Sequence, residues 1–165
     1  MTTVAKNDLE ALVRREYPEP HAILGAHAVD GGVVIRALRP SAQAVAVKPS
    51  RGKSVPLTEI HPGGIWEGEI EGAELPLKYK LKVDYGTGGK FTIHDPYAFL
   101  PTIGELDLHL MGEGRHEELY LRLGSHPIEH EGVQGTAFAV WAPAARAAGA
   151  QTAKAVPVTP WCSMT

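Results

Sequence analysis

The sequence predicts an all-β fold led by a short helix. In residues 77–85 every second side chain is apolar while lysines fill most positions between them, which is the period of a strand with one buried face. The 165 residues also include 18 glycines and 13 prolines without a fixed repeat, as is typical of short strands joined by turns. The length excludes a complete (β/α)₈ barrel, which needs about 250 residues.

The first expected element is a helix within residues 1–18. Asn7 or Asp8 can cap it, and apolar residues at positions 9, 12 and 13 follow at helical spacing. The Tyr-Pro-Glu-Pro run of residues 17–20 ends it, because proline fixes φ and removes a backbone donor.

Five strands are expected next, separated by glycine and proline turns. The Gly-Thr-Gly-Gly run of residues 86–89 predicts a hairpin and therefore an antiparallel sheet with one solvent-facing surface. The expected strands cover residues 33–38, 44–47, 66–70, 77–85 and 90–94.

The pattern changes after Pro101. Residues 105–111 are ambiguous, whereas Leu119, Tyr120 and Leu123 lie at helical spacing and predict a helix over residues 115–123 that Gly124 ends. A further strand is expected at residues 136–141, and the Ala-, Thr- and Pro-rich residues 147–165 are expected to form an irregular tail.

Charge and cysteine content exclude several classes of protein. Sixteen Lys and Arg against nineteen Asp and Glu give a net charge of −3, so the basic excess typical of nucleic-acid or anionic-membrane binding is missing. Cys162 is the only cysteine, and nothing calls for an oxidising compartment. Because the N-terminus lacks a signal-peptide pattern and no apolar run is long enough to span a bilayer, a cytoplasmic location is expected.

Two local patterns resemble chemical motifs. Residues 126–130, His-Pro-Ile-Glu-His, fit the H-x-x-E-H zinc-protease pattern, but that pattern requires a helix and here contains Pro127. Gly-Lys-Ser at residues 52–54 resembles the end of a P-loop, but Val47 stands where its first glycine belongs. We interpret the histidines as solvent-facing and Lys48, Arg51 and Lys53 as solvating a hairpin loop, with a zinc hydrolase and an anion site as the alternatives.

Aromatic and lysine side chains supply the remaining candidates. Trp66, Tyr97 and Trp141 can stack on sugar rings, with Trp66 favoured because it follows a glycine turn, although aromatic residues in strands usually belong to the core. Lys78, Lys80 and Lys82 form either a solvated sheet face or a surface that docks on a neighbouring domain. The many carboxylates single out no catalytic pair.

Three groups of segments together indicate a family. They are Pro-His-Ala-Ile-Leu-Gly-Ala-His at residues 20–27 with residues 33–40, Asp-Pro-Tyr-Ala-Phe-Leu-Pro at residues 95–101 with residues 104–124, and Gly-Thr-Ala-Phe-Ala-Val-Trp-Ala-Pro at residues 135–143. In order and spacing they resemble the N-terminal part of bacterial 1,4-α-glucan (glycogen) branching enzymes.

The resemblance implies an immunoglobulin-like β-sandwich over residues 19–103, a helical connector over residues 104–131, and the first strand of a second, glycogen-binding-like sandwich over residues 132–146. It implies that full-length relatives cleave an α-1,4-glucan and re-form it as an α-1,6 branch without a metal or organic cofactor. Their catalytic carboxylates belong to a barrel, so no residue here inherits a catalytic role and the chain alone is expected to be inactive.

The expected partners are therefore α-glucan and the catalytic domain. The first module would bind glucan and influence the length of the transferred chain; alternatively it is a structural module that packs through Lys78, Lys80, Lys82 and Tyr120 and binds no sugar. After Arg146 the chain departs from the family pattern, and we interpret this as a frameshift or truncated gene model near Ala147.

Overall fold

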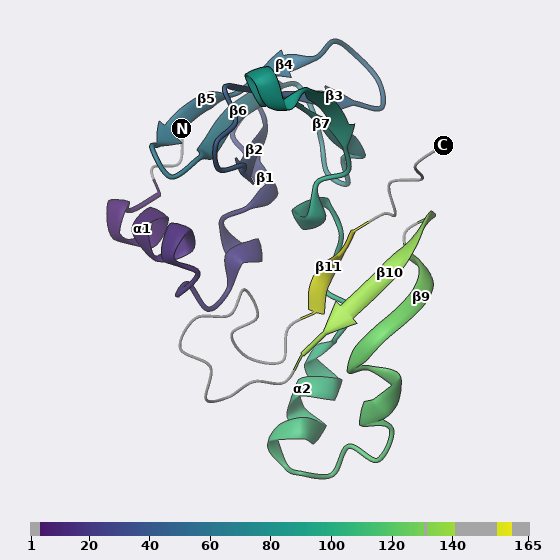
Figure 1. The fold of residues 1–165 in the computed structure, drawn as a ribbon. Helices are drawn as coiled ribbons and strands as arrows, with labels where there is room; N and C mark the ends of the chain where they lie inside the picture. The colour runs from purple at the N-terminus through teal and green to yellow at the C-terminus, as the bar shows by residue number, and fades with distance from the viewer. Residues whose placement is uncertain (1–3, 131, 141–154, 160–165) are drawn as a thin grey trace. The chain divides into compact units, whose positions relative to one another are not determined.

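The structure is a computed structural model that describes residues 4–130, 132–140 and 155–159. It comprises two compact units, Met1–Ala98 and Phe99–Thr165, called the first and second unit below. Figure 1 shows that strands dominate the chain, and this confirms the predicted all-β class.

The first unit contains two four-stranded antiparallel sheets. Sheet A has the order β1-β2-β6-β5, and sheet B has the order β4-β3-β7-β8. The strands of sheet A are β1 (Gly25–Val29), β2 (Gly32–Leu38), β6 (Ile65–Glu71) and β5 (Thr58–His61). Those of sheet B are β4 (Val55–Pro56), β3 (Ala44–Pro49), β7 (Tyr79–Asp84) and β8 (Lys90–Ile93).

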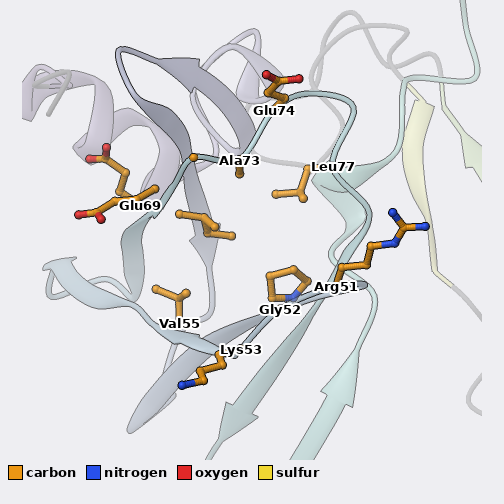
Figure 2. A pocket seen from close by; sticks show the side chains of 12 residues that line it. Arg51, Gly52, Lys53, Val55, Glu69, Ala73, Glu74 and Leu77 are labelled. Carbon is orange, nitrogen blue, oxygen red and sulfur yellow. The ribbon is translucent and has the colours of Figure 1, made fainter.

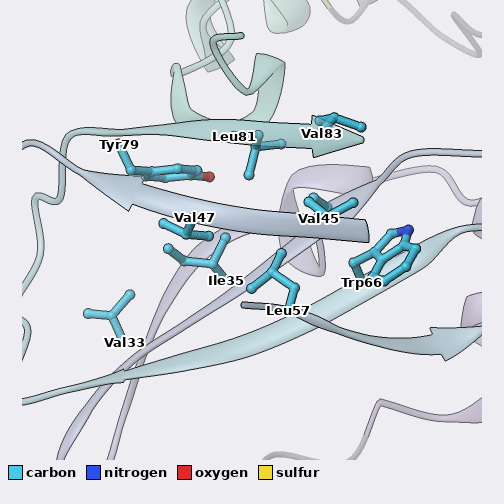
Figure 3. Close-up of a cluster of buried hydrophobic side chains, with 10 residues drawn as sticks. Val33, Ile35, Val45, Val47, Leu57, Trp66, Tyr79, Leu81 and Val83 are labelled. Carbon is cyan, nitrogen blue, oxygen red and sulfur yellow. The ribbon is translucent and has the colours of Figure 1, made fainter. Parts of the chain in front are cut away.

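The main core lies between these two sheets (Figure 3). Its members alternate along the strands, since β7 buries Tyr79, Leu81 and Val83 and exposes the lysines between them. This is the period-two pattern of a strand with one face in water. The buried cluster consists of Val33, Ile35, Ala37, Val45, Val47, Leu57, Trp66, Tyr79, Leu81 and Val83.

A second cluster holds the N-terminal helix α1 (Lys6–Arg14) against sheet A. Leu9 and Leu12 pack with Ile65 of β6 and with the segment that precedes β1. The His61 imidazole of β5 also lies 3.4 Å from the Glu10 carboxylate of α1. The predicted N-terminal helix is therefore confirmed, but it begins at Lys6 after the N-cap Ala5, so Asn7 and Asp8 lie within it and the expected cap was wrong. The short 3₁₀ turn η1 (Pro20–Ala22) follows the helix.

All five strands predicted in the first unit are present, as β2, β3, β6, β7 and β8. Three others, β1, β4 and β5, were not predicted from the sequence. They are short or carry small and polar side chains, so their hydrophobic alternation is weak. Two 3₁₀ turns, η2 (Gly86–Gly88) and η3 (Pro96–Ala98), lie before and after β8.

The second unit differs more from its prediction. The ambiguous segment is the helix α2 (Glu105–Gly112), in which the Asp107 carboxylate accepts a hydrogen bond from the Gly104 N–H at 3.1 Å. The helix expected over residues 115–123 is only the 3₁₀ turn η4 (Leu119–Leu121). Because the loop of residues 113–118 fixes His116 on Asp107, the helical spacing of Leu119, Tyr120 and Leu123 is not realised as an α-helix.

The second unit also holds more strand than expected. An antiparallel sheet of order β11-β10-β9 is formed by β9 (Gly124–His130), β10 (Val133–Ala139) and β11 (Ala155–Thr159). The predicted strand at residues 136–141 corresponds to β10. β9 is a strand within the segment expected to be a helical connector, and β11 is a strand within the expected irregular tail. The rest of that tail lies outside the described residues.

Candidate functional site

The first unit has a cleft of about 750 Å³ between its two sheets (Figure 2). One wall comes from the loop of residues 50–54 that joins β3 to β4, and the other from the end of β6 and the loop that leads to β7. Its volume lies within the range of ordinary ligand-binding pockets, about 300–1,000 Å³. The lining residues are Pro49, Arg51, Gly52, Lys53, Val55, Glu69, Ile70, Glu71, Gly72, Ala73, Glu74 and Leu77.

The middle of the cleft is apolar and its rim is charged. Figure 2 shows Val55, Ala73 and Leu77 facing the middle, while Lys53 and Glu69 stand at the rim on different walls. Val55 and Leu77 are half-buried, and Leu77 packs against the main core. The cleft floor is therefore a partly exposed continuation of the core between the sheets.

The charged rim residues keep their hydrogen-bonding capacity free. Arg51 and Lys53 supply cationic donors, and Glu69, Glu71 and Glu74 supply carboxylate acceptors. Within the described part of the chain none of the five forms an ion pair or a hydrogen bond with another side chain. Glu69 and Glu71 alternate with the core-facing Ile70 along β6, so their side chains project from the face of sheet A that carries the Arg36–Glu67 pair and not toward sheet B.

A different surface of the first unit carries the lysine face, defined by Lys48, Lys80, Lys82 and Lys90 on the outside of sheet B. Lys48 lies directly opposite Lys80 in the register of β3 and β7, and like charges in such a position repel. Lys90 pairs with Asp84 at 2.8 Å; the other three have no ion pair among the described residues.

The pKa values of three groups near the lysine face are shifted by its charges or by burial. Partial burial and then the Lys80 charge lower the pKa of His94. The hydrogen bond from Lys90 lowers the pKa of Asp84, and the same bond raises the pKa of Lys90. A depression of about 320 Å³ beside these strands is lined mostly by apolar residues, among them Val45, Val83 and Phe91, with Lys82, Asp84 and Lys90 also bordering it.

A buried polar cluster around Asp95 joins β7 to the segment that follows β2 and to η3. The Asp95 carboxylate accepts hydrogen bonds from the Tyr79 hydroxyl at 2.7 Å and the Tyr97 N–H at 3.3 Å, and it lies 3.5 Å from an Arg39 guanidinium nitrogen. Burial raises the pKa of Asp95 and of both tyrosines. No role for Asp95 was predicted from the sequence. Its position before Pro96 and between His94 and Tyr97 is the one local sign that it has a structural role.

The three aromatic candidates have different surroundings. Trp66 is only 6% exposed, belongs to the main core, and donates its indole N–H to the Arg39 carbonyl at 3.3 Å. A buried indole offers no face to a sugar, so we correct this expectation and assign no glucan contact to Trp66. Tyr97 is half-buried and packs edge-on against the His21 ring, while Trp141 lies outside the described residues.

The packing candidates are exposed. Lys78, Lys80 and Lys82 all face solvent along β7 and just before it, and Tyr120 in η4 of the second unit is 70% exposed. Lys80 and Lys82 lie on the lysine face, and Tyr120 belongs to the other unit. Among the described candidates, Trp66, Tyr97, Lys78, Lys80, Lys82 and Tyr120 do not line the cleft, whereas Arg51 and Lys53 of the predicted hairpin loop do.

The zinc-protease pattern does not have the helix it requires. Its residues form β9, and the His126 imidazole donates to the Leu123 carbonyl at 2.8 Å. Across the described ranges, no three His, Cys, Asp or Glu side chains gather as metal ligands. Within the same ranges, no helix has the length and apolar character to cross a membrane.

The second unit has its own polar centre at Asp107. The carboxylate lies 2.9 Å from the His116 Nε2 and accepts a hydrogen bond from the Arg122 Nε at 3.2 Å. These contacts, led by that from His116, lower the pKa of Asp107. This cluster was not predicted from the sequence, because turns without a regular hydrophobic pattern separate Asp107 from His116 and Arg122.

The two sheets and the open cleft define the first unit as a small β-sandwich module with a surface site. The chain belongs to the family described as the alpha-1,4-glucan branching enzyme GlgB, N-terminal domain, whose family model matches residues 5–97. That match coincides with the first unit.

Curated relatives agree with this assignment. The chain is 51% identical over 138 residues to the 1,4-alpha-glucan branching enzyme GlgB of Myxococcus xanthus, covering 84% of this chain and 19% of the relative. It is 47% identical over 150 residues to that of Thermobifida fusca, covering 88% and 20%. The chain thus spans about a fifth of the length of these relatives. Among solved structures, a pullulanase from Bacillus acidopullulyticus matches 48% of this chain and 10% of its own, with 23% identity and a TM-score of 0.39, too distant to add to the assignment.

Proposed function

We propose that this chain is the N-terminal module of a glycogen branching enzyme and that its first unit binds α-glucan and influences the length of the transferred chain. The observation that carries the proposal is the coincidence of the family match, residues 5–97, with a compact unit that has its own core. A separate module suits the holding of a long polymer, because a second attachment raises the local concentration of the chain near a catalytic centre.

In this proposal the chemistry lies elsewhere in the relatives, which are five times longer than the matched segment. The full-length enzyme cleaves an α-1,4-glucan and re-forms it as an α-1,6 branch, and the 165-residue chain alone is inactive. The proposal includes the cytoplasmic location expected from the sequence.

Affinity electrophoresis tests the glucan-binding part. The full 165-residue chain is run in native gels with and without glycogen, beside a reference protein that does not bind polysaccharide. We expect the chain to migrate more slowly relative to the reference when glycogen is present. Equal relative mobility in both gels would contradict the proposal.

The lysine face favours a second function, a purely structural one. Three lysines without ion pairs on one sheet face, in a chain of net charge −3, suit docking on an acidic surface of the remaining enzyme. The test adds the Myxococcus xanthus relative, lacking its matched segment, to this chain and measures the melting temperature. A rise that is lost in Lys80→Glu/Lys82→Glu, together with no retention by glycogen, would favour docking over glucan binding.

A further inference from the structure

The second unit has a small core and an apolar surface. Among the described residues its buried cluster holds Ile103 and Ala139, with Leu108 and Leu123 packed against it. Of the large apolar side chains that are exposed in the described ranges, Leu75 and Phe91 lie in the first unit and the other six lie in the second. Single exposed apolar side chains are ordinary, but a concentration of them marks an interaction surface.

The helix α2 is apolar on two opposite sides. Leu108 packs against the buried cluster, whereas Leu106 and Leu110 lie one helical turn apart and share the other side. Leu106 is 70% exposed and Leu110 is half-buried. A helix that is apolar all round normally lies in the interior of a protein. The second side of α2 is therefore suited to packing against a further element.

A second group of exposed apolar side chains lies next to this helix. Tyr120 and Leu121 of η4 are 70% and 52% exposed. The Arg122 Nε donates to the Asp107 carboxylate at 3.2 Å, and Leu121 and Leu106 directly precede these two residues. This ion pair keeps η4 beside the start of α2, so Leu106, Tyr120 and Leu121 form one surface, called the connector patch below.

The size of the connector patch distinguishes between possible partners. A stable interface between separate chains buries about 800 Å² on each of them. Three side chains of this size provide well under that area, even when they are fully covered. A contact within one chain needs less area, because the covalent connection removes most of the cost of association. The patch therefore fits a partner in the same chain better than a second copy.

The curated relatives contain such a partner. The match to the Myxococcus xanthus relative spans 138 residues, more than the first unit contains, so it extends into the second unit. The matched segment is only 19% of that relative. In a full-length enzyme the second unit is therefore joined to a much larger remainder.

We propose that the connector patch is the surface on which the remainder of a full-length branching enzyme packs, through an apolar surface of its own. The inference rests on one part of the proposed function, namely that this chain is a module of a larger enzyme. It differs from docking through the lysine face, because the contact is apolar and belongs to the second unit.

The test compares the 165-residue chain with a chimera in which residues 1–140 of this chain replace the matched segment of the Myxococcus xanthus relative. Hydrogen exchange of residues 105–112 and 119–123 is measured in both proteins. We expect exchange to be at least about tenfold slower in the chimera, since covering one large apolar side chain stabilises by that factor. Equal exchange rates in the two proteins would overturn the proposal.

The double substitution Tyr120→Ser/Leu121→Ser locates the contact. In the 165-residue chain it should change exchange by less than about twofold, because both side chains are exposed there. In the chimera it should restore the faster exchange of the chain. Leu75→Ser/Phe91→Ser is the matched control, since it removes two exposed apolar side chains of the first unit and should leave the slow exchange of the chimera unchanged.

The remaining outcomes identify other occupants of the patch. If Tyr120→Ser/Leu121→Ser accelerates exchange equally in both proteins, the patch is covered within this chain and the proposal is overturned. It is also overturned if sedimentation shows a dimer of the chain that this substitution dissociates, because a second copy is then the partner. If only Lys80→Glu/Lys82→Glu accelerates exchange in the chimera, docking occurs through the lysine face instead.

The glucan-binding part of the proposed function is measured separately. Retention of the 165-residue chain by glycogen does not depend on the connector patch in this inference, so Tyr120→Ser/Leu121→Ser should be retained like the wild-type chain. If glycogen retains neither form while exchange is slow in the chimera, glucan binding fails and the connector patch stands. If both forms are retained while the chain and the chimera exchange equally, glucan binding stands and the connector patch fails.

Discussion

The Tyr79 hydroxyl donates a 2.7 Å hydrogen bond to the Asp95 carboxylate, and both residues are buried. Tyr79 belongs to β7 of sheet B, whereas Asp95 begins the segment that returns to β1 of sheet A through η3. Burial first, and then the nearby Asp95 charge, raises the pKa of Tyr79. The hydroxyl therefore remains protonated and donating at neutral pH, and it ties the end of the first unit to its core.

Removing this hydroxyl should destabilise the first unit. Tyr79→Phe leaves the ring in the core but deprives a fully buried carboxylate of its shortest hydrogen bond. We expect a loss of about 1–3 kcal/mol in the free energy of unfolding, measured by urea denaturation. Tyr85→Phe is the control, since the Tyr85 hydroxyl has no hydrogen bond among the described residues and its loss should change stability by less than about 0.5 kcal/mol. Equal effects of the two substitutions would contradict the role given to Asp95.

A glycine at the start of β1 allows η3 to pack closely. Gly25 has φ +94°, and a Cβ atom there would lie 2.4 Å from the Tyr97 carbonyl oxygen. Gly31 has nearly the same φ, +89°, but a Cβ atom there meets nothing within 4 Å. Gly31→Ala thus reports the cost of backbone conformation alone, about 1–2 kcal/mol.

We expect Gly25→Ala to cost at least about 1 kcal/mol more than Gly31→Ala, because it adds a backbone clash to the same conformational cost. Thermal unfolding of both variants measures the difference. If the two variants unfold at the same temperature, the close approach of Gly25 to Tyr97 does not constrain the fold.

Sequence patterns predicted the strands that carry several large apolar side chains and missed the short or mostly small and polar ones. The alternation of β7 is visible because Tyr79, Leu81 and Val83 point to the core between lysines. In β1 the residues are Gly, Ala, His, Ala and Val, and their partnership with β2 depends on the hairpin rather than on hydrophobic side chains.

The candidate site was harder to predict because it is made by side chains distant in sequence. Arg51 and Glu69 line one cleft only because β3, β4 and β6 come together in three dimensions, and a single sequence contains no record of that proximity. Trp66 was misjudged for a related reason: its position beside a glycine turn suggested exposure, but β6 turns the indole into the core.

A buried ion pair joins the two central strands of sheet A. Arg36 of β2 and Glu67 of β6 lie opposite each other, with 2.7 Å between the Arg36 Nε and the Glu67 carboxylate, and their side chains are 4% and 13% exposed. Glu67→Gln keeps the shape but removes the charge that faces the buried guanidinium. We expect the free energy of unfolding to fall by about 3 kcal/mol, because the buried guanidinium loses its charged partner. Urea denaturation measures this change.

Glu59→Gln is the matched control for this pair. Glu59 lies on the neighbouring edge strand β5, is exposed, and has no ion pair among the described residues. Its replacement should change the free energy of unfolding by less than about 0.5 kcal/mol. A loss of stability as small in Glu67→Gln as in Glu59→Gln would show that Arg36 does not depend on its cross-strand partner.

The Asp107 cluster predicts a pH dependence in the second unit. Because contacts led by the hydrogen bond from His116 lower the pKa of Asp107, the folded state favours the ionised carboxylate. Its stabilising contribution is fully present above the ordinary aspartate pKa of about 3.9 and is lost as the pH falls through the lowered folded value.

Asp107→Asn should therefore destabilise the second unit at pH 7 by about 2 kcal/mol, the typical value of hydrogen bonds to a charged group, and by much less near pH 2. Hydrogen exchange of the Gly104 amide, which donates to Asp107, measures the loss of local protection at pH 7. Urea unfolding at pH 7 and near pH 2 measures the change in the free energy of unfolding. Glu117→Gln, at an exposed position of the same unit, should show neither change. If the free energy of unfolding differs between Asp107→Asn and wild type by the same amount at pH 7 and at pH 2, the cluster does not stabilise the ionised form of Asp107.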